Sequence, residues 1–347
     1  MESFELAGAA GSGAVLITWP DFPLEGPGAG ALLKAAGLSL RDAPKLGART
    51  SADMRRLTDG AVAAIVSTDP FDASVFTACP TLRVIARVGV GVDSIDVPAA
   101  SAAGVAVTTT PGANERTTAE HAVALMLACV RRVVEHDGAV RSGRWARTGR
   151  HVPRELAGQT VGLVGYGRIG KLVAGCLAPF GVRLVVCDPN ERAGEEAEQL
   201  ELDELLATAD IVSIHVPLQP DTRGLIGARE LRLMGRDAIL INTARGGIVD
   251  EQALLAALEH GRLGAAALDV FESEPPSCER LFALRNVVLT PHTGGISEQS
   301  VARMLGQATS SVLAALRGER PFGLVNDEVL AHARWRPRAG AATEVQW

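Results

Sequence analysis

Three residues late in the sequence have side chains that suit proton transfer and carboxylate binding: Arg245, Glu274 and His292. Each lies shortly after a short apolar run of the kind that forms a buried parallel strand. In an open α/β sheet the carboxyl ends of the strands face the ligand crevice. We therefore expect the three side chains to meet at one edge of a sheet.

A histidine titrates near neutral pH, so His292 can give a proton to a carbonyl oxygen or take one from a hydroxyl group. Glu274, bonded to the other ring nitrogen, would fix the ring and stabilise its charged form. The planar guanidinium of Arg245 can bind a carboxylate with two hydrogen bonds. Singly, these residues have ordinary alternatives: a loop histidine, a turn glutamate and a solvated arginine. Together they predict hydride transfer on a small 2-hydroxy or 2-keto acid.

A glycine-rich segment earlier in the chain predicts the source of the hydride. Residues 160–170 read TVGLVGYGRIG, an apolar strand that runs into the pattern GxGxxG, and a helix is expected over 171–180. Gly165 permits a tight turn, Gly167 lets the backbone approach a pyrophosphate, and Gly170 lets helix and strand pack closely. The predicted cofactor contacts in this segment are Gly165, Tyr166, Gly167, Arg168, Ile169 and Gly170.

A carboxylate ends the next apolar run. Asp188 lies eighteen residues beyond Gly170 and can accept hydrogen bonds from the hydroxyls of an adenosine ribose. Its charge would repel a 2′-phosphate, so NAD is favoured over NADP. Arg192, close by in sequence, weakens that preference.

Two series of strands alternating with helices must position these residues. Such alternation predicts parallel sheets with right-handed crossovers. A long helix, capped by Thr117 or Thr118, is expected over 118–136; it is apolar nearly all round and should be buried, with a subunit contact as one option. A last helix is expected over 297–317. The predicted strands are 14–19, 61–67, 82–86 and 105–109 in the first series, and 160–164, 183–187, 211–215, 238–242, 265–269 and 287–289 in the second.

Length and composition agree with a two-domain globular protein. The chain has 347 residues, 47% of them hydrophobic, and a net charge of −6, which argues against nucleic acid or an anionic membrane as partner. The longest apolar stretch, 122–130, is too short to span a bilayer. Five well-separated cysteines without metal-ligand spacing indicate reduced thiols in a cytoplasmic protein with no metal site.

With these residues in place, the sequence resembles the D-isomer-specific 2-hydroxyacid dehydrogenases, which include D-3-phosphoglycerate dehydrogenase. The similarity runs from about residue 75 to 326. Its most specific segments are RVGVGVD (87–93), TPG (110–112), GYGRIG (165–170), HVP (215–217), NTARGG (242–247), LDVFESEP (268–275) and PHTGG (291–295).

The resemblance implies a fold of two Rossmann-like or flavodoxin-like α/β domains with parallel sheets. The NAD-binding domain, 112–305, would be inserted in a substrate domain of 1–111 and 306–347, and the protein would form a homodimer through the cofactor domain. It further implies that Thr243 and Asp269 contact the nicotinamide side, that Val216 lines the adenosine side, and that Arg87, Val90 and Gly91, together with Arg245, bind the substrate.

The substrate itself is less well specified. Phosphoglycerate dehydrogenases commonly carry a basic residue just after the strand that matches 61–66, whereas this chain reads Ser67-Thr68-Asp69, an acid and no cation. Glyoxylate, hydroxypyruvate or a 2-keto acid with an apolar tail is therefore favoured over a phosphorylated acid, although Arg87 is retained. Alternatives are phosphoglycerate itself, phosphite, and a corepressor-like protein that binds NAD(H) without catalysis.

Overall fold

The computed structural model describes residues 13–145, 147–148 and 152–335, so the outermost dozen residues at each end of the predicted substrate domain lie outside it. The chain forms two compact units, one of residues 1–114 and 298–347 and the other of 115–297. The predicted boundary at 305/306 falls inside the last long helix, α12 (Glu298–Leu316), because that helix packs along its length in the first unit.

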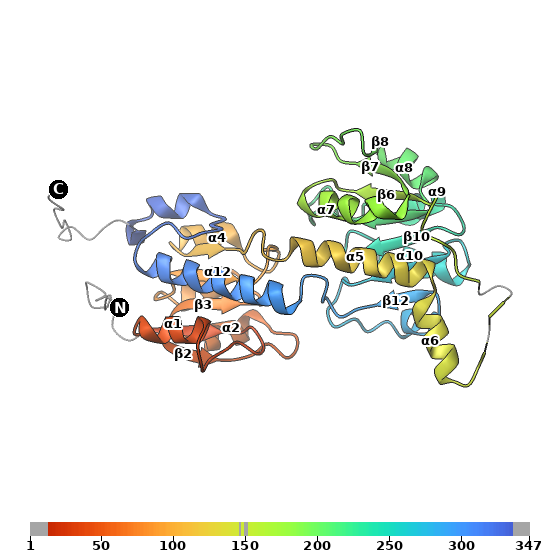
Figure 1. Ribbon diagram of the computed structural model, residues 1–347. Helices are drawn as coiled ribbons and strands as arrows, with labels where there is room; N and C mark the ends of the chain where they lie inside the picture. The colour runs from red at the N-terminus through yellow and green to blue at the C-terminus, as the bar shows by residue number, and fades with distance from the viewer. Residues whose placement is uncertain (1–12, 146, 149–151, 336–347) are drawn as a thin grey trace. The chain divides into compact units, whose positions relative to one another are not determined.

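The first unit, coloured red to orange and blue in Figure 1, is built on a parallel sheet. The strand order of this sheet is β2-β1-β3-β4-β5. This is the flavodoxin-like order. Side chains alternate between its two faces, so Val15 and Ile17 join the core under α12, whereas Leu16 joins the opposite core. The strands are β1 (Ala14–Ile17), β2 (Ser39–Asp42), β3 (Ala61–Val66), β4 (Val84–Arg87) and β5 (Ala106–Thr108), and the remaining helices are α1 (Ala29–Ala35), α2 (Ser51–Leu57), α3 (Ala73–Ala78) and α4 (Val97–Ala102).

The second unit carries a parallel sheet with the order β12-β11-β10-β9-β6-β7-β8. Read from β8, this is the dinucleotide-binding order extended by one strand. The strands are β6 (Thr160–Val164), β7 (Arg183–Cys187), β8 (Glu198–Gln199), β9 (Ile211–Ile214), β10 (Ile239–Asn242), β11 (Ala265–Leu268) and β12 (Val287–Leu289). The helices are α5 (Glu115–Val130), α6 (Val133–Arg141), α7 (Arg168–Leu177), α8 (Leu202–Thr208), α9 (Ala228–Leu233), α10 (Glu251–Glu259) and α11 (Glu279–Phe282). The predicted fold class is confirmed.

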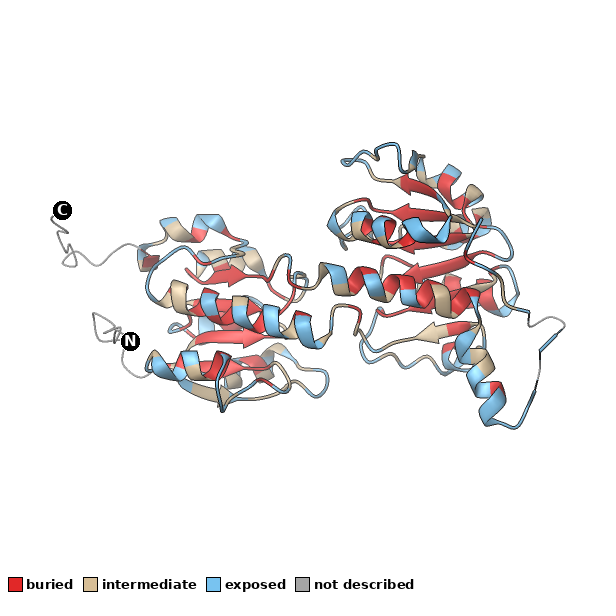
Figure 2. Cartoon of the chain, in the orientation of Figure 1, coloured by how far each residue is buried: buried red, intermediate tan, exposed pale blue. Residues whose placement is uncertain are grey.

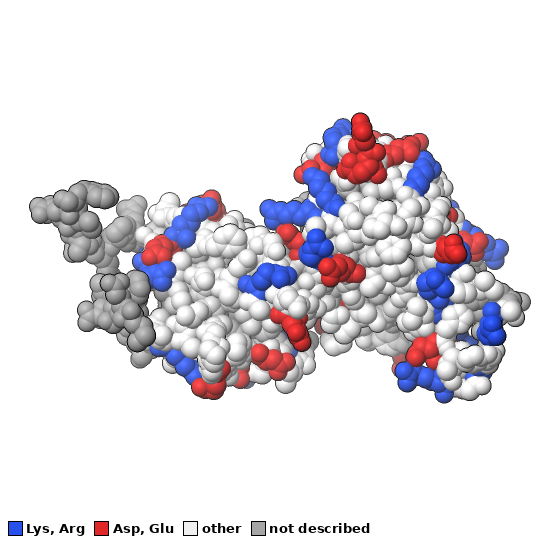
Figure 3. Space-filling view, viewed as in Figure 1, with Lys and Arg blue, Asp and Glu red and all other residues white. Residues whose placement is uncertain are grey.

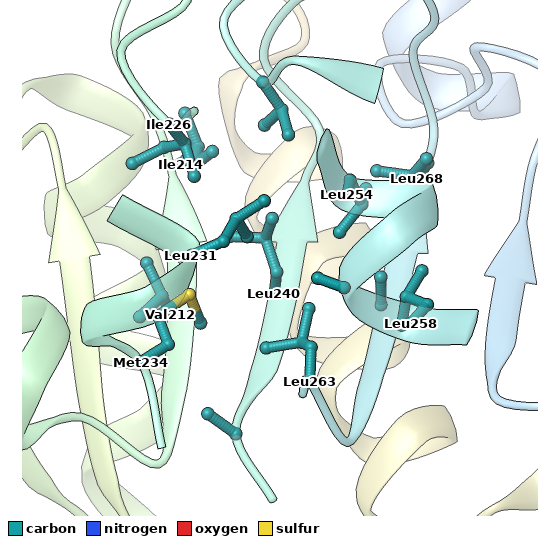
Figure 4. Close-up of a cluster of buried hydrophobic side chains, with 14 of the residues drawn as sticks. Val212, Ile214, Ile226, Leu231, Met234, Leu240, Leu254, Leu258, Leu263 and Leu268 are labelled. Atoms are coloured by element: carbon teal, nitrogen blue, oxygen red, sulfur yellow. The ribbon is translucent and has the colours of Figure 1, made fainter. Parts of the chain in front are cut away.

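Both faces of this sheet are covered by helices, so its inner strands are buried, whereas the edge strands β8 and β12 are only partly buried and the helices keep an exposed side (Figure 2). On one face, Leu231 of α9 and Leu254 and Leu258 of α10 pack over Val212 and Leu240 (Figure 4). Each such leucine, removed from water, contributes roughly 1.5–3 kcal/mol of hydrophobic stabilisation. On the other face, α5 and α7 cover the sheet.

The predicted helix over 118–136 is wrong in both its start and its continuity. Helix α5 begins at Glu115, which places Thr118 inside it, and the chain leaves the helical conformation at Arg132, whose φ is 52°. Its buried side chains, including Ala122 and Met126, pack into the core of the unit itself. The exposed apolar side chains lie on the following helix, α6. Within the described ranges no helix has the length and apolarity needed to cross a membrane.

Candidate active site

The strand register of the second unit brings six strand ends to one level. Val164 pairs with both Cys187 and Ile214, Ile214 with Asn242, Asn242 with Leu268, and Leu268 with Leu289. The next residue of each strand therefore lies in one row along the carboxyl edge of the sheet. In sheet order the row is Asp188, Gly165, His215, Thr243, Asp269 and Thr290.

The glycine-rich turn lies between β6 and α7, where the strand order reverses direction. Gly165 has a φ of 99°, and a Cβ there would lie 2.7 Å from the backbone of His215; a Cβ on Gly170 would lie 2.3 Å from the Gly165 oxygen. Around Gly167 the space is open. Helix α7 begins at Arg168 rather than 171, so its first N–H groups open directly at the turn, which favours a bound pyrophosphate.

Asp188 is joined to this turn by a hydrogen bond. Its Oδ2 accepts from the Tyr166 N–H at 2.7 Å, and its Oδ1 accepts from Asn190 and Glu191. Burial raises the pKa of Asp188, but these backbone hydrogen bonds and the charge of Lys171 together hold it below its ordinary value. The carboxylate is therefore ionised at neutral pH.

The other predicted cofactor contacts differ in how they meet the turn. The Tyr166 ring is buried, and its hydroxyl donates to Glu196 at 2.7 Å, so only its backbone borders the turn. Burial and the Glu196 carboxylate raise the pKa of Tyr166 to about 12. Ile169 packs into the core, and Arg168 is mostly exposed and pairs with Glu115. Contacts of these three residues with the cofactor stay a prediction.

Two buried polar atoms in the row lack a partner. His215 Nε2 and Thr243 Oγ1 are buried and have no hydrogen-bond partner among the residues that the structure describes. Burial lowers the pKa of His215 to about 4, which keeps the ring neutral. Unpaired buried polar atoms are costly without a ligand or water. Together with the open glycine turn and the ionised Asp188, they fit a dinucleotide lying along the row. Val216 is partly buried against the neighbouring core.

The acid/base candidates lie at the ends of neighbouring strands. The Nδ1 atom of His292 lies 2.7 Å from Oε2 of Glu274, and about a third of each side chain is exposed. Burial raises the pKa of Glu274, whereas the hydrogen bond and charge of His292 and the charge of Arg245 lower it. The lowering effects are the larger, so the pKa of Glu274 lies below its ordinary value. Arg245 also donates from Nη1 to the Ala244 oxygen at 2.7 Å. The three predicted residues are thus close enough to interact electrostatically.

In the first unit, the predicted substrate contacts form the turn after β4. The side chain of Val90 is exposed, and the contact of Val90 and Gly91 with substrate stays a prediction. Arg87 is buried, and its guanidinium donates to the carbonyl oxygens of Val88 and Gly91. Its described hydrogen bonds thus organise the turn itself, and its contact with substrate stays a prediction.

Asp69, the acid that follows β3, is held inside the first unit, and the substrate preference drawn from it stays a prediction. This carboxylate is fully buried, accepts a hydrogen bond from Thr18 Oγ1 and pairs with Arg49 Nη1 at 2.9 Å. Lys45 Nζ donates to the oxygen of Thr68 at 3.0 Å. Cations from a distant segment therefore reach the end of β3, and Asp69 presents no repelling charge there.

Sequence reasoning missed His121, Thr290 and His215. His121 Nε2 lies 3.1 Å from Thr290 Oγ1, which in turn donates to Asp269 Oδ1. Thr290 and His215 each directly follow an apolar strand, a signal that could have found them. His121 is the last of several polar residues in the first half of α5, and nothing in its sequence neighbourhood relates it to residue 269.

Charged side chains of both signs lie beside one another on the face seen in Figure 3, so neither sign forms a continuous field there.

Comparison with known proteins agrees with this geometry. Residues 123–294 match the family model "D-isomer specific 2-hydroxyacid dehydrogenase, NAD binding domain". A glyoxylate reductase of Korarchaeum cryptofilum is 45% identical over 272 residues, which are 76% of this chain and 82% of that protein. A D-3-phosphoglycerate dehydrogenase of Mycobacterium leprae is 42% identical over 74% of this chain, which matches about half (51%) of that longer protein.

A solved structure, the TT0316 protein of Thermus thermophilus, superimposes with a TM-score of 0.83 at 40% identity, over 90% of this chain and 99% of that one. The similarity therefore extends through both units. The chain belongs to the family of D-isomer-specific 2-hydroxyacid dehydrogenases and is an NAD-dependent oxidoreductase that acts on CH–OH groups.

Proposed function

We propose that His292 is the acid/base of this enzyme, that Glu274 orients it, and that Arg245 binds the carboxylate and carbonyl of a small 2-keto acid. The observation that carries the proposal is the 2.7 Å contact between His292 Nδ1 and Glu274 Oε2 beside Arg245. The unit of 115–297 would serve as the cofactor domain, and the unit of 1–114 and 298–347 as the substrate domain.

The hydrogen-bond pattern gives each residue a defined task. Glu274 accepts the Nδ1 proton of His292, which leaves Nε2 to exchange a proton with the substrate oxygen. NADH, when bound, supplies the hydride for the α carbon. In that direction His292 gives its Nε2 proton to the carbonyl oxygen, and a proton from solvent restores it; oxidation reverses both steps. Arg245 holds the carboxylate so that the carbonyl stays beside the imidazole.

For the cofactor we propose NAD(H) rather than NADP(H). Asp188 is ionised and lies at the end of β7, where the adenosine ribose is expected. Thr243, Asp269 and Val216 are proposed to contact the cofactor further along the row. A titration that gave equal dissociation constants for NADH and NADPH would contradict this preference.

Glyoxylate and hydroxypyruvate are the proposed substrates. The extent of the similarity to glyoxylate reductases supports this choice. Lys45 and Arg49 near the end of β3 support phosphohydroxypyruvate as the second candidate. The experiment is to follow NADH oxidation with a panel of glyoxylate, hydroxypyruvate, phosphohydroxypyruvate and an apolar keto acid. Exclusive turnover of the phosphorylated acid would contradict the first choice, and no turnover of any keto acid would contradict the proposed function.

A cytoplasmic homodimer joined through the cofactor unit is also proposed. Val133, Val134 and Val140 of α6 are each more than half exposed, as is the nearby Trp145, and a second copy would remove them from water. All five cysteines are unpaired, as expected in a reducing compartment. Light scattering after gel filtration would measure the mass, and a monomer at micromolar concentration would contradict the dimer.

A further inference from the structure

The loop that contains His292 is hydrogen-bonded to one residue, Asp269, which directly follows the neighbouring strand β11. The Asp269 carbonyl oxygen accepts from the His292 N–H at 2.8 Å, its Oδ1 accepts from the Thr293 N–H at 2.9 Å, and its Oδ2 accepts from the Gly294 N–H at 2.7 Å. Three consecutive N–H groups therefore end on a single residue. The proposed mechanism does not use this arrangement.

The backbone conformation of His292 requires stabilisation by neighbouring groups. Its φ is 54°, in the left-handed region that side chains other than glycine rarely occupy. A residue holds such a conformation only when its surroundings fix it. In this loop, the hydrogen bonds from residues 292–294 to Asp269 fix the backbone of His292.

Asp269 is itself held by two further side chains. Its carboxylate is almost fully buried and accepts a 2.5 Å hydrogen bond from Thr290 Oγ1. His121, from α5, places Nε2 at 3.1 Å from Thr290 Oγ1 and 3.4 Å from Asp269 Oδ1. Burial raises the pKa of Asp269, whereas the contacts with His121, Thr290 and the two N–H groups lower it by more, so the pKa lies below its ordinary value.

Proton positions in this chain of contacts follow from the number of hydrogens available. Thr290 has one hydroxyl hydrogen and gives it to the carboxylate, so a lone pair of its oxygen faces His121. His121 must then carry a hydrogen on Nε2 to complete the contact. A side chain without a donor at that point would leave Thr290 and Asp269 less firmly fixed.

Steric contact joins the same residues to the loop. A Cβ added to Gly294 would lie 2.7 Å from Asp269 Oδ2 and 3.3 Å from His121 Cδ2. The loop backbone thus lies directly against both side chains, and a displacement of either would reach the peptide groups next to His292.

We propose that His121 is a positioning residue for His292, acting through Thr290 and Asp269 to hold the acid/base loop in its left-handed conformation. This inference rests on the proposed function, because it concerns the same proton donor. In the proposed mechanism the proton comes from His292 and not from His121. Loss of the His121 side chain should therefore lower the rate of proton transfer without removing the proton donor.

The test compares His121→Leu, which removes the donor, with His121→Gln, which keeps an N–H near the position of Nε2. His121→Leu should lower kcat for keto-acid reduction by about tenfold to a hundredfold, because small misplacements of a reacting group have effects of that size. The dissociation constant of NADH should stay within about twofold, since the turn after β6 is untouched. His121→Gln should recover most of kcat.

His260→Leu is the matched control, since His260 is an exposed histidine of the same unit that caps α10. It should leave kcat unchanged. A His121→Leu protein with wild-type kcat, or one whose only change is a lower melting temperature, would overturn the proposal.

Thr290→Val guards against a His121 variant that does not fold. It removes the middle of the chain of contacts and should lower kcat in the same way; unchanged turnover would overturn the proposal. If both folded, the double variant should lose no more than the worse single one. His292→Gln separates the two failures: an active His292→Gln enzyme refutes the proposed function, whereas an inactive one beside a fully active His121→Leu enzyme refutes only this inference.

Discussion

Asp188 and Tyr166 are joined by a 2.7 Å hydrogen bond from the Tyr166 N–H to Asp188 Oδ2, which ties the end of β7 to the glycine-rich turn after β6. The carboxylate therefore has two tasks: it can meet a ribose, and it supports the turn that would receive the pyrophosphate. Substitutions at Asp188 must separate these tasks.

Asp188→Asn keeps an oxygen for the Tyr166 N–H but removes the charge. We expect NADH to bind about tenfold more weakly, since a hydrogen bond to a charged group is lost, and discrimination against NADPH to narrow. Fluorescence titration with both cofactors measures this. Asp188→Ala should weaken NADH further because the turn also loses its acceptor; equal affinities of Asn and Ala variants would argue against the supporting role.

His292→Gln removes the proposed proton donor while keeping a polar side chain of similar reach. We expect kcat to fall by about a hundredfold to ten-thousandfold, the usual contribution of a positioned acid or base, with NADH binding unchanged. Stopped-flow measurement of NADH oxidation gives kcat, and fluorescence gives the dissociation constant. Retained turnover would mean that another group moves the proton.

Arg245→Ala removes the cation beside Glu274. Arg245 is proposed to bind the substrate carboxylate in both the ground state and the transition state. KM should therefore rise and kcat should fall, which lowers kcat/KM by about a hundredfold. Arg262→Ala, at an exposed arginine of the same unit, is the control. An Arg245→Ala enzyme that lost only NADH affinity would place Arg245 in the cofactor site.

The pairing of Glu274 with His292 should make the free energy of unfolding depend on pH in the acidic range. The pKa of Glu274 in the folded protein lies below the ordinary value of 4.5, so the unfolded chain takes up the proton first as the pH falls. The contribution is complete above that ordinary value and is lost as the pH drops through the lower, native pKa. The melting temperature of the wild type should therefore exceed that of Glu274→Gln by a margin that shrinks in acid. A margin independent of pH would contradict the pairing.

Asp69→Asn tests the ion pair near the end of β3. The change leaves Arg49 without its buried partner, and we expect a loss of unfolding free energy of about 3 kcal/mol in urea denaturation. Because the carboxylate presents no charge to the surface, relative activity with phosphohydroxypyruvate should not rise. A selective gain on that substrate would instead support the interpretation of Asp69 as a repelling acid.

The positions of the strand ends are the most predictable part of the site, although the roles of His215 and Thr290, which follow two of these strands, are missed. The strands ending before Asp188, Thr243, Asp269 and Thr290 were all predicted, and parallel pairing alone brings their ends to one edge. What the sequence could not provide was the direction of each side chain. Arg87 turns onto its own loop and Tyr166 points into the core, and both outcomes depend on packing.

Other misses have local physical causes. The break after α5 occurs at Arg132 in a left-handed conformation, with no glycine or proline to announce it. Strand β2 is short, lies at the edge of its sheet and carries Ser39, Arg41 and Asp42, so it lacks the apolar run that marked the buried strands. Arg49 and Asp69 come together only through the crossover between parallel strands, which separates neighbours in space by many residues of sequence.

The acid/base pair, its carboxylate neighbours and the histidine behind them all belong to the single stretch 115–297, whereas the turn after β4 and the residues at the end of β3 belong to the other unit. If the proposed roles hold, one uninterrupted piece of coding sequence contains everything needed to set the proton donor before any substrate arrives. Descendants of this chain could then diverge in the acids they accept by changes in the flanking segments alone, without rebuilding the reaction.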